Sequence, residues 1–211
     1  MNISDFDYVL PPHLIAQTPA EPRDSSRLLA LRRNSGETEH RLFRDIGYYL
    51  KPGDLLVANN SRVFPARLHA RRLPSGGKVE VLLLRRAGGD VWEALVRPAK
   101  RLRVGASLVF VPKDGRDVDA LDAAPQAQVV GETPTGTRLI RFFIEEVIHS
   151  LGEMPLPPYI HHPLADPERY QTVYSNSDGS AAAPTAGLHF TPELMDQLRN
   201  KGVKVLFVTL H

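Results

Sequence analysis

The stretch KVEVLLLRR, residues 78–86, lies between two clusters of turn residues, PSGG at 74–77 and AGGD at 87–90. An apolar run of this length, bounded by glycine-rich turns, is typical of a β-strand in a hairpin. Similar runs lie on both sides: VFPARLHARRL at 63–73, VWEALVRP at 91–98, ASLVFVP at 106–112, AQVVGE at 127–132 and TRLIRFF at 137–143. Six short strands at this spacing predict a small closed or nearly closed antiparallel β-barrel over residues 63–143.

The flanking sequence changes to mixed elements. Before the barrel we expect a hairpin over 26–43 that turns at Asn34 to Gly36, a short helix over 43–50 and a buried strand, DLLVAN, over 54–59. After it we expect helices at 144–152 and 167–175, and a third that Thr191 caps and Gly202 ends. The last segment, VKVLFVTL at 203–210, predicts a strand buried on both faces, as in α/β sheets.

The predicted fold class is therefore α/β, with a mixed α/β domain that is interrupted by an inserted small antiparallel β-barrel. Residues 1–62 form the first part of the α/β domain, residues 63–143 the barrel, and residues 144–211 the second part of the α/β domain.

Composition excludes several classes of protein. The chain has 211 residues, 42% of them hydrophobic, which is enough for one large core or two modest ones. No apolar run approaches the roughly 18 residues that span a bilayer, and the acidic start MNISDFDYVL does not resemble a secretory signal. The sequence has no cysteine, which excludes disulfides, thiol catalysis and thiolate metal sites. We expect a monomer in the cytoplasm, with no membrane contact.

Basic charge is concentrated in one segment. From Arg62 to Arg103 there are eleven Lys or Arg residues and three acidic ones, a net charge of +8 that leaves −6 for the rest of the chain. Such a segment favours contact with a polyanion, although a solvated barrel face explains it equally well. Within it we select Arg97, Lys100, Arg101 and Arg103 as candidate phosphate contacts.

Polar residues follow the predicted strand DLLVAN. Asn59, Asn60, Ser61 and Arg62 stand where α/β sheets usually bind ligands, and Arg62 can bind a carboxylate or phosphate through two parallel hydrogen bonds. Ordinary turn chemistry explains Asn-Asn-Ser equally well. In EPRDSSRLL, residues 21–29, we expect Arg23, Asp24 and Arg27 to form a surface ion pair.

The stretch AAAPTAGLHFTPEL, residues 181–194, places His189 after small residues and just before a helix start. A helix amino terminus favours the neutral imidazole that a general base requires, so His189 is the leading catalytic candidate. A structural histidine that holds a loop remains the alternative. His161 and His162 point to opposite sides of an extended segment, so we predict no metal site there. Neither a phosphate-binding loop nor a dinucleotide fingerprint occurs.

The segments FDYVLPPHLIAQTPAEPRDSSRLL, NNSRVFPARL, GGKVEVLLL, WEALVRPAKRLRVG, PLPPYI, YQTVYS and AAAPTAGLHFTPEL closely resemble the S-adenosylmethionine:tRNA ribosyltransferase-isomerase family of queuosine biosynthesis. The matches follow the family's order across nearly the whole chain. The resemblance implies an α/β domain with an inserted barrel. It also implies transfer of the ribosyl portion of S-adenosylmethionine to the aminomethyl group of a 7-deazaguanine at the tRNA wobble position. The transferred ribose rearranges to an epoxycyclopentanediol, and adenine and methionine are released.

That chemistry needs a base for a ribose C5′ proton, an acid for the leaving adenine and a cation for the methionine carboxylate. We expect His189 to be the base or acid, with His211 next in line, and Arg62 to bind the carboxylate. Asn59, Asn60 and Thr185 are candidates for polar contacts to the substrate, and Gly187 for a close backbone approach. S-adenosylmethionine is then a substrate, no separate cofactor or metal is expected, and the anticodon arm of tRNA is the partner.

This chain differs from the family pattern in three places. Asn60 stands where many members have an aspartate, so we expect no proton transfer there, and His161 follows PLPPYI where a basic residue is common. The family continues beyond VTLH, and we expect the carboxyl-terminal part of its α/β domain to lie outside these 211 residues.

Two alternative functions remain. One is an RNA-binding module that stacks bases on Trp92 or Phe110. The other is a hydrolase or lyase in which Asp24 or Glu153 hydrogen-bonds to His189.

Overall fold

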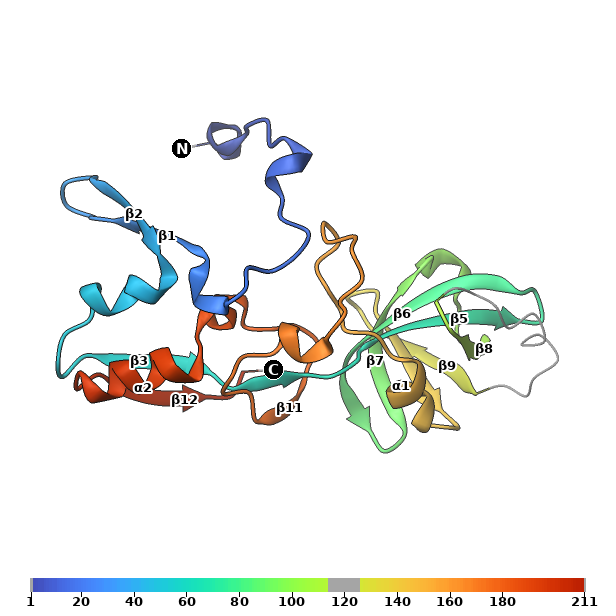
Figure 1. Ribbon diagram of the computed structural model, residues 1–211. Helices are drawn as coiled ribbons and strands as arrows, with labels where there is room; N and C mark the ends of the chain where they lie inside the picture. The colour runs from blue at the N-terminus through green and yellow to red at the C-terminus, as the bar shows by residue number, and fades with distance from the viewer. Residues whose placement is uncertain (1, 114–125, 211) are drawn as a thin grey trace.

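The computed structural model describes residues 2–113 and 126–210, which form two lobes (Figure 1). One lobe is a closed barrel whose strands follow the order β10-β7-β6-β5-β8-β9. The bounds are β5 Arg67–Leu73, β6 Gly77–Gly88, β7 Val91–Arg97, β8 Ser107–Val111, β9 Ala127–Glu132 and β10 Arg138–Phe142. Every pair is antiparallel, so the prediction of a six-stranded antiparallel barrel is confirmed.

The barrel closes because its strands alternate between two environments. On β5, Leu68 and Ala70 are buried in the barrel core, while Arg67, His69 and Arg71 are more exposed on the outer face. Successive side chains of a strand point to opposite faces, so this alternation separates an apolar interior from a charged exterior. The helix α1, Glu146–Leu151, adds Val147 and Ile148 to the same core.

The second lobe is a set of small sheets and helices. β3, Leu55–Asn59, pairs in parallel with β12, Lys204–Val208, and β1, Arg27–Leu31, forms the predicted hairpin with β2, Thr38–Leu42. The 3-10 helix η4, Phe43–Tyr49, follows the hairpin, and α2, Pro192–Asn200, is capped by Thr191, whose side chain accepts a hydrogen bond from Leu194 N. A second core unites these elements, with Phe43, Phe190, Leu194, Met195, Leu198 and Val203 buried.

Two predictions for this lobe are wrong. The strands β3 and β12 are not buried on both faces, because Leu55 is 53% exposed and Leu206 is 56% exposed. The helix expected over 167–175 is the single 3-10 turn η7, Pro167–Tyr170. The next two residues, Gln171 and Thr172, are buried, so their packing decides the conformation there instead of helical propensity.

Two short pairings connect the lobes. β4, Ser61–Val63, pairs in parallel with β11, Ser177–Ser180, just before the chain enters the barrel. An isolated antiparallel bridge joins Arg67, the first residue of β5, to Glu153, which follows α1. The chain thus enters and leaves the barrel near the same place, although the domain boundaries 1–62, 63–143 and 144–211 stay a prediction.

Short 3-10 turns complete the described chain. They are η1 Ile3–Phe6, η2 Pro12–Leu14, η3 Arg23–Ser25, η5 Ala99–Arg101 and η8 Thr185–His189. The amino-terminal segment that carries η1 and η2 extends away from both cores (Figure 1) and exposes large apolar side chains such as Ile3 and Val9. In the described ranges we found no helix with the length and apolar character needed to cross a membrane.

Candidate active site

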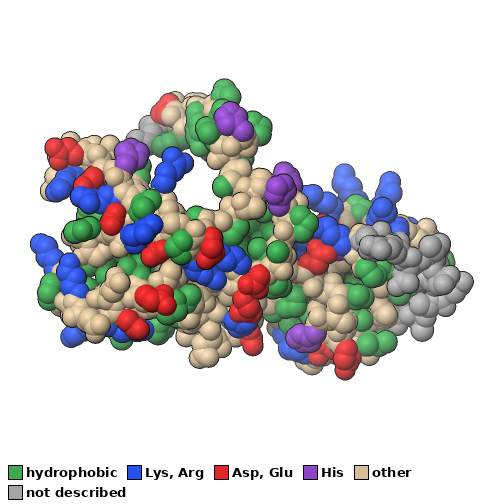
Figure 2. Space-filling model, in the orientation of Figure 1, with side chains coloured by type: hydrophobic (Ala, Val, Ile, Leu, Met, Phe, Trp, Pro, Cys, Tyr) green, Lys and Arg blue, Asp and Glu red, His purple; other side chains and the backbone are tan. Residues whose placement is uncertain are grey.

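A cleft of about 1050 Å³ lies where the two lobes meet. Its lining comes from β4 and the start of the barrel, from β6 and β7, from α1 and the segment after it, and from the loop that contains η7. Figure 2 shows acidic and basic side chains side by side in this middle region of the molecule. The cleft thus combines a volume suited to a small-molecule ligand with charges of both signs.

One wall of the cleft is aromatic and carries a fixed carboxylate. Trp92 packs against Phe64 with ring centroids 5.4 Å apart, and the Arg86 guanidinium lies 4.9 Å from the Trp92 ring centroid. Trp92 Nε1 donates to Glu145 Oε1 at 2.9 Å, and Arg86 pairs with the same oxygen at 2.6 Å. The hydrogen bond from Trp92, followed by the one from Arg86, lowers the pKa of Glu145. Glu145 is therefore held as an anion.

Arg62 is the one predicted substrate contact that lines the cleft. Its guanidinium pairs with Glu168, donates to Ser175 Oγ at 3.1 Å, and has Nε 3.8 Å from Asp178 Oδ1. A substrate carboxylate at this place would compete with Glu168 for the same donors. Its predicted role in carboxylate binding stays a prediction.

Asn59 and Asn60 bind the end of the neighbouring strand and are not among the residues that line the cleft. Asn59 Oδ1 accepts from Ser61 N at 2.9 Å and from Leu210 N at 3.3 Å. Asn60 Oδ1 accepts from Thr209 Oγ1 at 2.7 Å, and the buried Ser61 donates its hydroxyl to Leu210 O at 2.6 Å. These contacts give the Asn-Asn-Ser run a structural role, and its predicted contacts to substrate remain untested.

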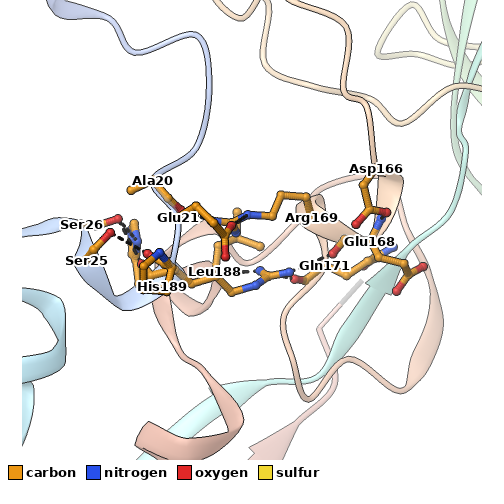
Figure 3. Close-up of polar contacts among 12 residues, drawn as sticks. Ala20, Glu21, Ser25, Ser26, Asp166, Glu168, Arg169, Gln171, Leu188 and His189 are labelled. Carbon is orange, nitrogen blue, oxygen red and sulfur yellow. Dashed lines mark hydrogen bonds and ion pairs between the residues drawn. The ribbon is translucent and has the colours of Figure 1, made fainter.

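His189 ends the turn η8 and is fixed by a hydrogen-bond chain (Figure 3). Its Nδ1 lies 3.0 Å from Ser26 Oγ, and Ser26 Oγ donates its only hydrogen to Arg23 O at 3.2 Å. When Ser26 donates to Arg23 O, Nδ1 carries the imidazole hydrogen and Nε2 keeps a lone pair, the arrangement that a general base needs. Burial is the main cause that lowers the pKa of His189, which favours the neutral ring.

The ring of His189 also packs on Phe43, with centroids 5.1 Å apart. His189 does not line the 1050 Å³ cleft, so the predicted open approach to it is not part of that cavity. The structure thus combines a base-like tautomer with contacts that a structural histidine would make, and the catalytic role of His189 stays a prediction. His211 lies outside the described residues.

Gly187 of η8 serves packing within this chain. A Cβ on Gly187 would lie 2.1 Å from Tyr174 Oη and 2.9 Å from Thr172 Cγ2. The close approach that we expected at Gly187 is therefore made by the protein's own side chains. Thr185 and Ala186 are exposed, and neither lines the cleft.

Arg23 has a different role from the predicted surface ion pair. Its guanidinium donates to Gln171 O at 2.8 Å, to Glu168 O at 3.0 Å and to Leu188 O at 3.2 Å. Burial lowers its pKa. Arg23 thus joins the η7 loop, which contributes to the cleft, to the turn that carries His189. Sequence reasoning missed this role, since the three carbonyl groups lie far from Arg23 in the chain.

Of the residues invoked for the alternatives, Phe110, Asp24 and Glu153 do not support them, whereas Trp92 is partly exposed in the cleft. Phe110 is 4% exposed and stacked on Phe142 inside the barrel, so it offers no surface for a base. Neither Asp24 nor Glu153 hydrogen-bonds to His189 in the described structure; the imidazole nearest Glu153 is His69, 3.8 Å away. His161 and His162 line the cleft, but the described residues contain no cluster of three metal-ligand side chains.

The family of the chain follows from comparison with known proteins. A model of the family described as "Queuosine biosynthesis protein" matches residues 3–211. The chain belongs to this family.

Curated relatives carry one name. The proteins of Moorella thermoacetica and Dehalococcoides mccartyi that are named S-adenosylmethionine:tRNA ribosyltransferase-isomerase are each 53% identical to this chain, over 216 and 211 residues. The protein of that name from Symbiobacterium thermophilum is 54% identical over 215 residues. Each match covers 100% of this chain and 60% of the relative, so the chain spans about 60% of the length of these proteins.

A solved structure is also similar. The crystal structure of S-adenosylmethionine tRNA ribosyltransferase from Thermotoga maritima is 38% identical, and the match covers 99% of this chain and 58% of that one, with a TM-score of 0.40.

Proposed function

We propose that the protein transfers and isomerises the ribosyl portion of S-adenosylmethionine onto 7-aminomethyl-7-deazaguanine at the wobble position of tRNA. The products are epoxyqueuosine in the tRNA, adenine and methionine. The observation that carries this proposal is the 53–54% identity, over the whole of this chain, to relatives that bear the name of that enzyme.

The cleft between the lobes supports the proposal by its size and charges. Its volume of about 1050 Å³ is at the upper end of ordinary small-molecule sites, roughly 300–1,000 Å³, which suits a site that must hold a nucleoside and part of an RNA together. The sulfonium, the methionine ammonium and the aminomethyl group of the substrates are cations, and Glu145, Glu153, Glu168 and Asp178 line the cleft. Arg62 supplies a cation for the methionine carboxylate.

His189 is the proposed proton-transfer group. In the tautomer in which Nδ1 donates to Ser26, Nε2 is free of a proton, and burial favours the neutral ring. A neutral imidazole can remove the acidified ribose C5′ proton and return it later, as general acid–base catalysis requires. Because His189 does not line the cleft, the proposal requires that the ribose extend beyond it to reach Nε2. Because Arg23 joins the His189 turn to the η7 loop, substrate that binds in the cleft can also influence the position of His189.

The proposal includes the partners and the setting of the enzyme. S-adenosylmethionine is consumed as a substrate, and no further cofactor takes part. The RNA partner is the anticodon arm of tRNA, and the protein works as a monomer in the cytoplasm.

The test is mass analysis of tRNA that contains the precursor base after incubation with S-adenosylmethionine and this chain. We expect the mass increase of the transferred epoxycyclopentanediol, with one adenine released for each modified tRNA. The same incubation with the full-length protein of Moorella thermoacetica is the control, which verifies that the tRNA and the S-adenosylmethionine used can react. If the full-length enzyme modifies the tRNA and this chain leaves it unchanged, the activity does not reside in these 211 residues alone.

A further inference from the structure

The outer face of the barrel has a groove that is separate from the cleft. Its volume is about 230 Å³, and its charged lining residues are His69, Arg71, Lys78, Glu80, Arg97 and Lys113. They come from β5, β6, β7 and the end of β8, so the groove crosses the strands on the solvent side of the barrel. Four of the six are permanent cations and one is an acid, a composition that favours an anionic ligand.

The strand register fixes these cations close together. Arg71 of β5 lies directly opposite Lys78 of β6, and Glu80 of β6 has His69 on one side and Arg97 of β7 on the other. Like charges that face each other across two strands are destabilising. The Arg71–Lys78 pair therefore costs the fold stability that a bound anion would restore.

Most of these cations lack an acidic partner in the described structure. Neither Lys78 nor Arg97 has a side-chain hydrogen bond or ion pair among the described residues, and Arg71 donates only to Gly76 O at 3.4 Å. Glu80 is shared with Arg67, whose Nε lies 3.8 Å away. Among the described residues, the groove thus has more cations than acidic partners for them.

The groove adjoins the cleft. Lys113 lines both cavities, and Glu153 on the cleft side lies 3.5 Å from Lys113 Nζ and 3.8 Å from His69 Nε2. Two buried nitrogen donors at this passage, Arg67 Nε and His69 Nε2, have no hydrogen-bond partner in the described structure. Buried polar nitrogens are nearly always paired in proteins, so a water molecule or a polar ligand would complete the pairing of these two, each of which has a carboxylate oxygen only at 3.8 Å.

We propose that the groove binds the phosphodiester backbone of an RNA strand and directs that strand into the cleft. Outward side chains of β5 recur about every 6.6 Å, so Arg67, His69 and Arg71 form a row of donors from the cleft along the barrel. The row ends near η5, where Arg72 Nη1 donates to Arg101 O at 2.8 Å. This inference rests on the proposed function for the identity of the RNA, and it deepens that function by naming the path of the strand.

The test measures direct binding of a fluorescent stem-loop RNA with the anticodon-arm sequence, without S-adenosylmethionine. The variant is Lys78→Ala with Arg97→Ala, two exposed positions. We expect at least a tenfold loss of affinity and a decrease of about two in the slope of log K against log salt, because two phosphate contacts are lost. The variant Lys78→Arg with Arg97→Lys keeps both charges and should bind nearly as the parent does.

The control is Arg33→Ala with Arg44→Ala, which removes the same charge from two exposed positions of the other lobe. An equal loss of affinity in the control, or an unchanged salt slope in the groove variant, would overturn the inference. Polyglutamate is tested as a competitor of the RNA. If its binding depends on Lys78 and Arg97 as strongly as RNA binding does, the groove binds an acidic protein and the inference is wrong. Melting temperatures of all variants verify that they fold.

The outcome is distinguishable from a failure of the proposed function. Binding is measured without the sulfonium substrate, so a chain that lacks transferase activity can still show RNA binding that depends on the groove. Conversely, suppose that the chain is active and that replacing Lys78 and Arg97 leaves its RNA affinity unchanged. The proposed function would then stand, and this inference would be wrong.

Discussion

His189 has contacts that suit both a structural and a catalytic role. The Ser26–Arg23 chain orients its ring, and in the tautomer with the hydrogen on Nδ1 it leaves Nε2 as an acceptor. A residue with this geometry can hold a loop and still transfer a proton. Only a substitution that keeps the size and polarity of the side chain distinguishes the two roles.

The first prediction is that His189→Gln lowers turnover in the complete enzyme by about a hundred to ten thousand fold. Glutamine keeps a polar edge toward Ser26 but cannot cycle a proton, and general acid–base catalysis usually contributes that factor. Adenine release reports turnover, while melting temperature and tRNA affinity should stay close to those of the parent. Adenine release at the parent rate, or a variant that does not fold, would return His189 to a structural role.

The second prediction concerns pH. Burial is the main cause that lowers the pKa of His189 below its ordinary value of 6.5, and the neighbouring Arg169 adds to this effect. The unfolded chain therefore binds the proton more readily, so the stability from the neutral ring is complete above about pH 6.5 and is lost as the pH falls through the folded-state pKa. Between about pH 7 and 5 the melting temperature of the parent should fall more steeply than that of His189→Gln. Parallel curves would contradict this.

The third prediction is that Gly187→Ala destabilises the fold by about 1–3 kcal/mol, the usual cost of an added methyl group in a packed site. The new Cβ would lie 2.1 Å from Tyr174 Oη. Urea unfolding measures the loss, and adding Tyr174→Phe should recover part of it because the clashing hydroxyl is removed. A stable Gly187→Ala variant would show that Tyr174 moves aside without cost.

At the scale of elements, the turn η5 and the residues around it carry the cations that we selected from the sequence. Arg97, Lys100, Arg101 and Arg103 are all exposed. Beneath them the buried Arg138 donates to Leu102 O at 2.7 Å and to Ala99 O at 3.1 Å. The buried guanidinium therefore fixes the backbone that carries these cations, and a fixed backbone reduces the entropy that is lost when they bind an anion.

The fourth prediction is that Lys100→Ala with Arg103→Ala weakens tRNA binding and lowers the salt slope by about two, since each lost phosphate contact changes that slope by nearly one. Affinities at several salt concentrations measure it. The double variant Arg33→Ala with Arg44→Ala is again the matched control. A slope equal to that of the parent would make the η5 cations a solvated face.

The elements differ in how well their sequence predicted them. The barrel strands and the β1–β2 hairpin were predictable, since glycine-rich turns bound them and the pattern is local. The burial of β3 and β12 was not predictable, because an apolar run does not determine how many faces of the strand other elements cover. Val57 of β3, for example, is 55% exposed. The cleft was not predictable either, since Arg62, Trp92 and Glu145 reach it from separate elements and only the tertiary fold brings them together.

At the scale of the whole molecule, the side chain of Gln17 connects the amino-terminal segment to the rim of the cleft. Gln17 Nε2 donates to Tyr159 O at 2.9 Å, and Gln17 Oε1 accepts from His161 N at 2.8 Å. Ile160 and His161 line the cleft, so this reciprocal pair of hydrogen bonds connects an otherwise exposed segment to the rim of the candidate site.

The fifth prediction is that Gln17→Ala releases this segment and leaves the rest of the fold intact. Two hydrogen bonds, each with a net contribution of about 1 kcal/mol, are lost at a place with little apolar burial. Hydrogen exchange in peptides from residues 2–16 should become several-fold faster, while barrel peptides exchange as before. Unchanged exchange in the amino-terminal peptides would show that other contacts hold the segment.

The two lobes also differ in how their strands end. The closed barrel presents no unpaired strand edge, because each of its six strands has a neighbour on both sides. β3 and β12 form a sheet of only two strands with exposed Leu206, Phe207 and Val208 on its surface. Free edges with apolar side chains are templates for pairing between molecules. When a chain limited to these 211 residues is concentrated or heated, intermolecular β-aggregation should therefore begin at β12, and a charged side chain introduced there should keep that chain in solution.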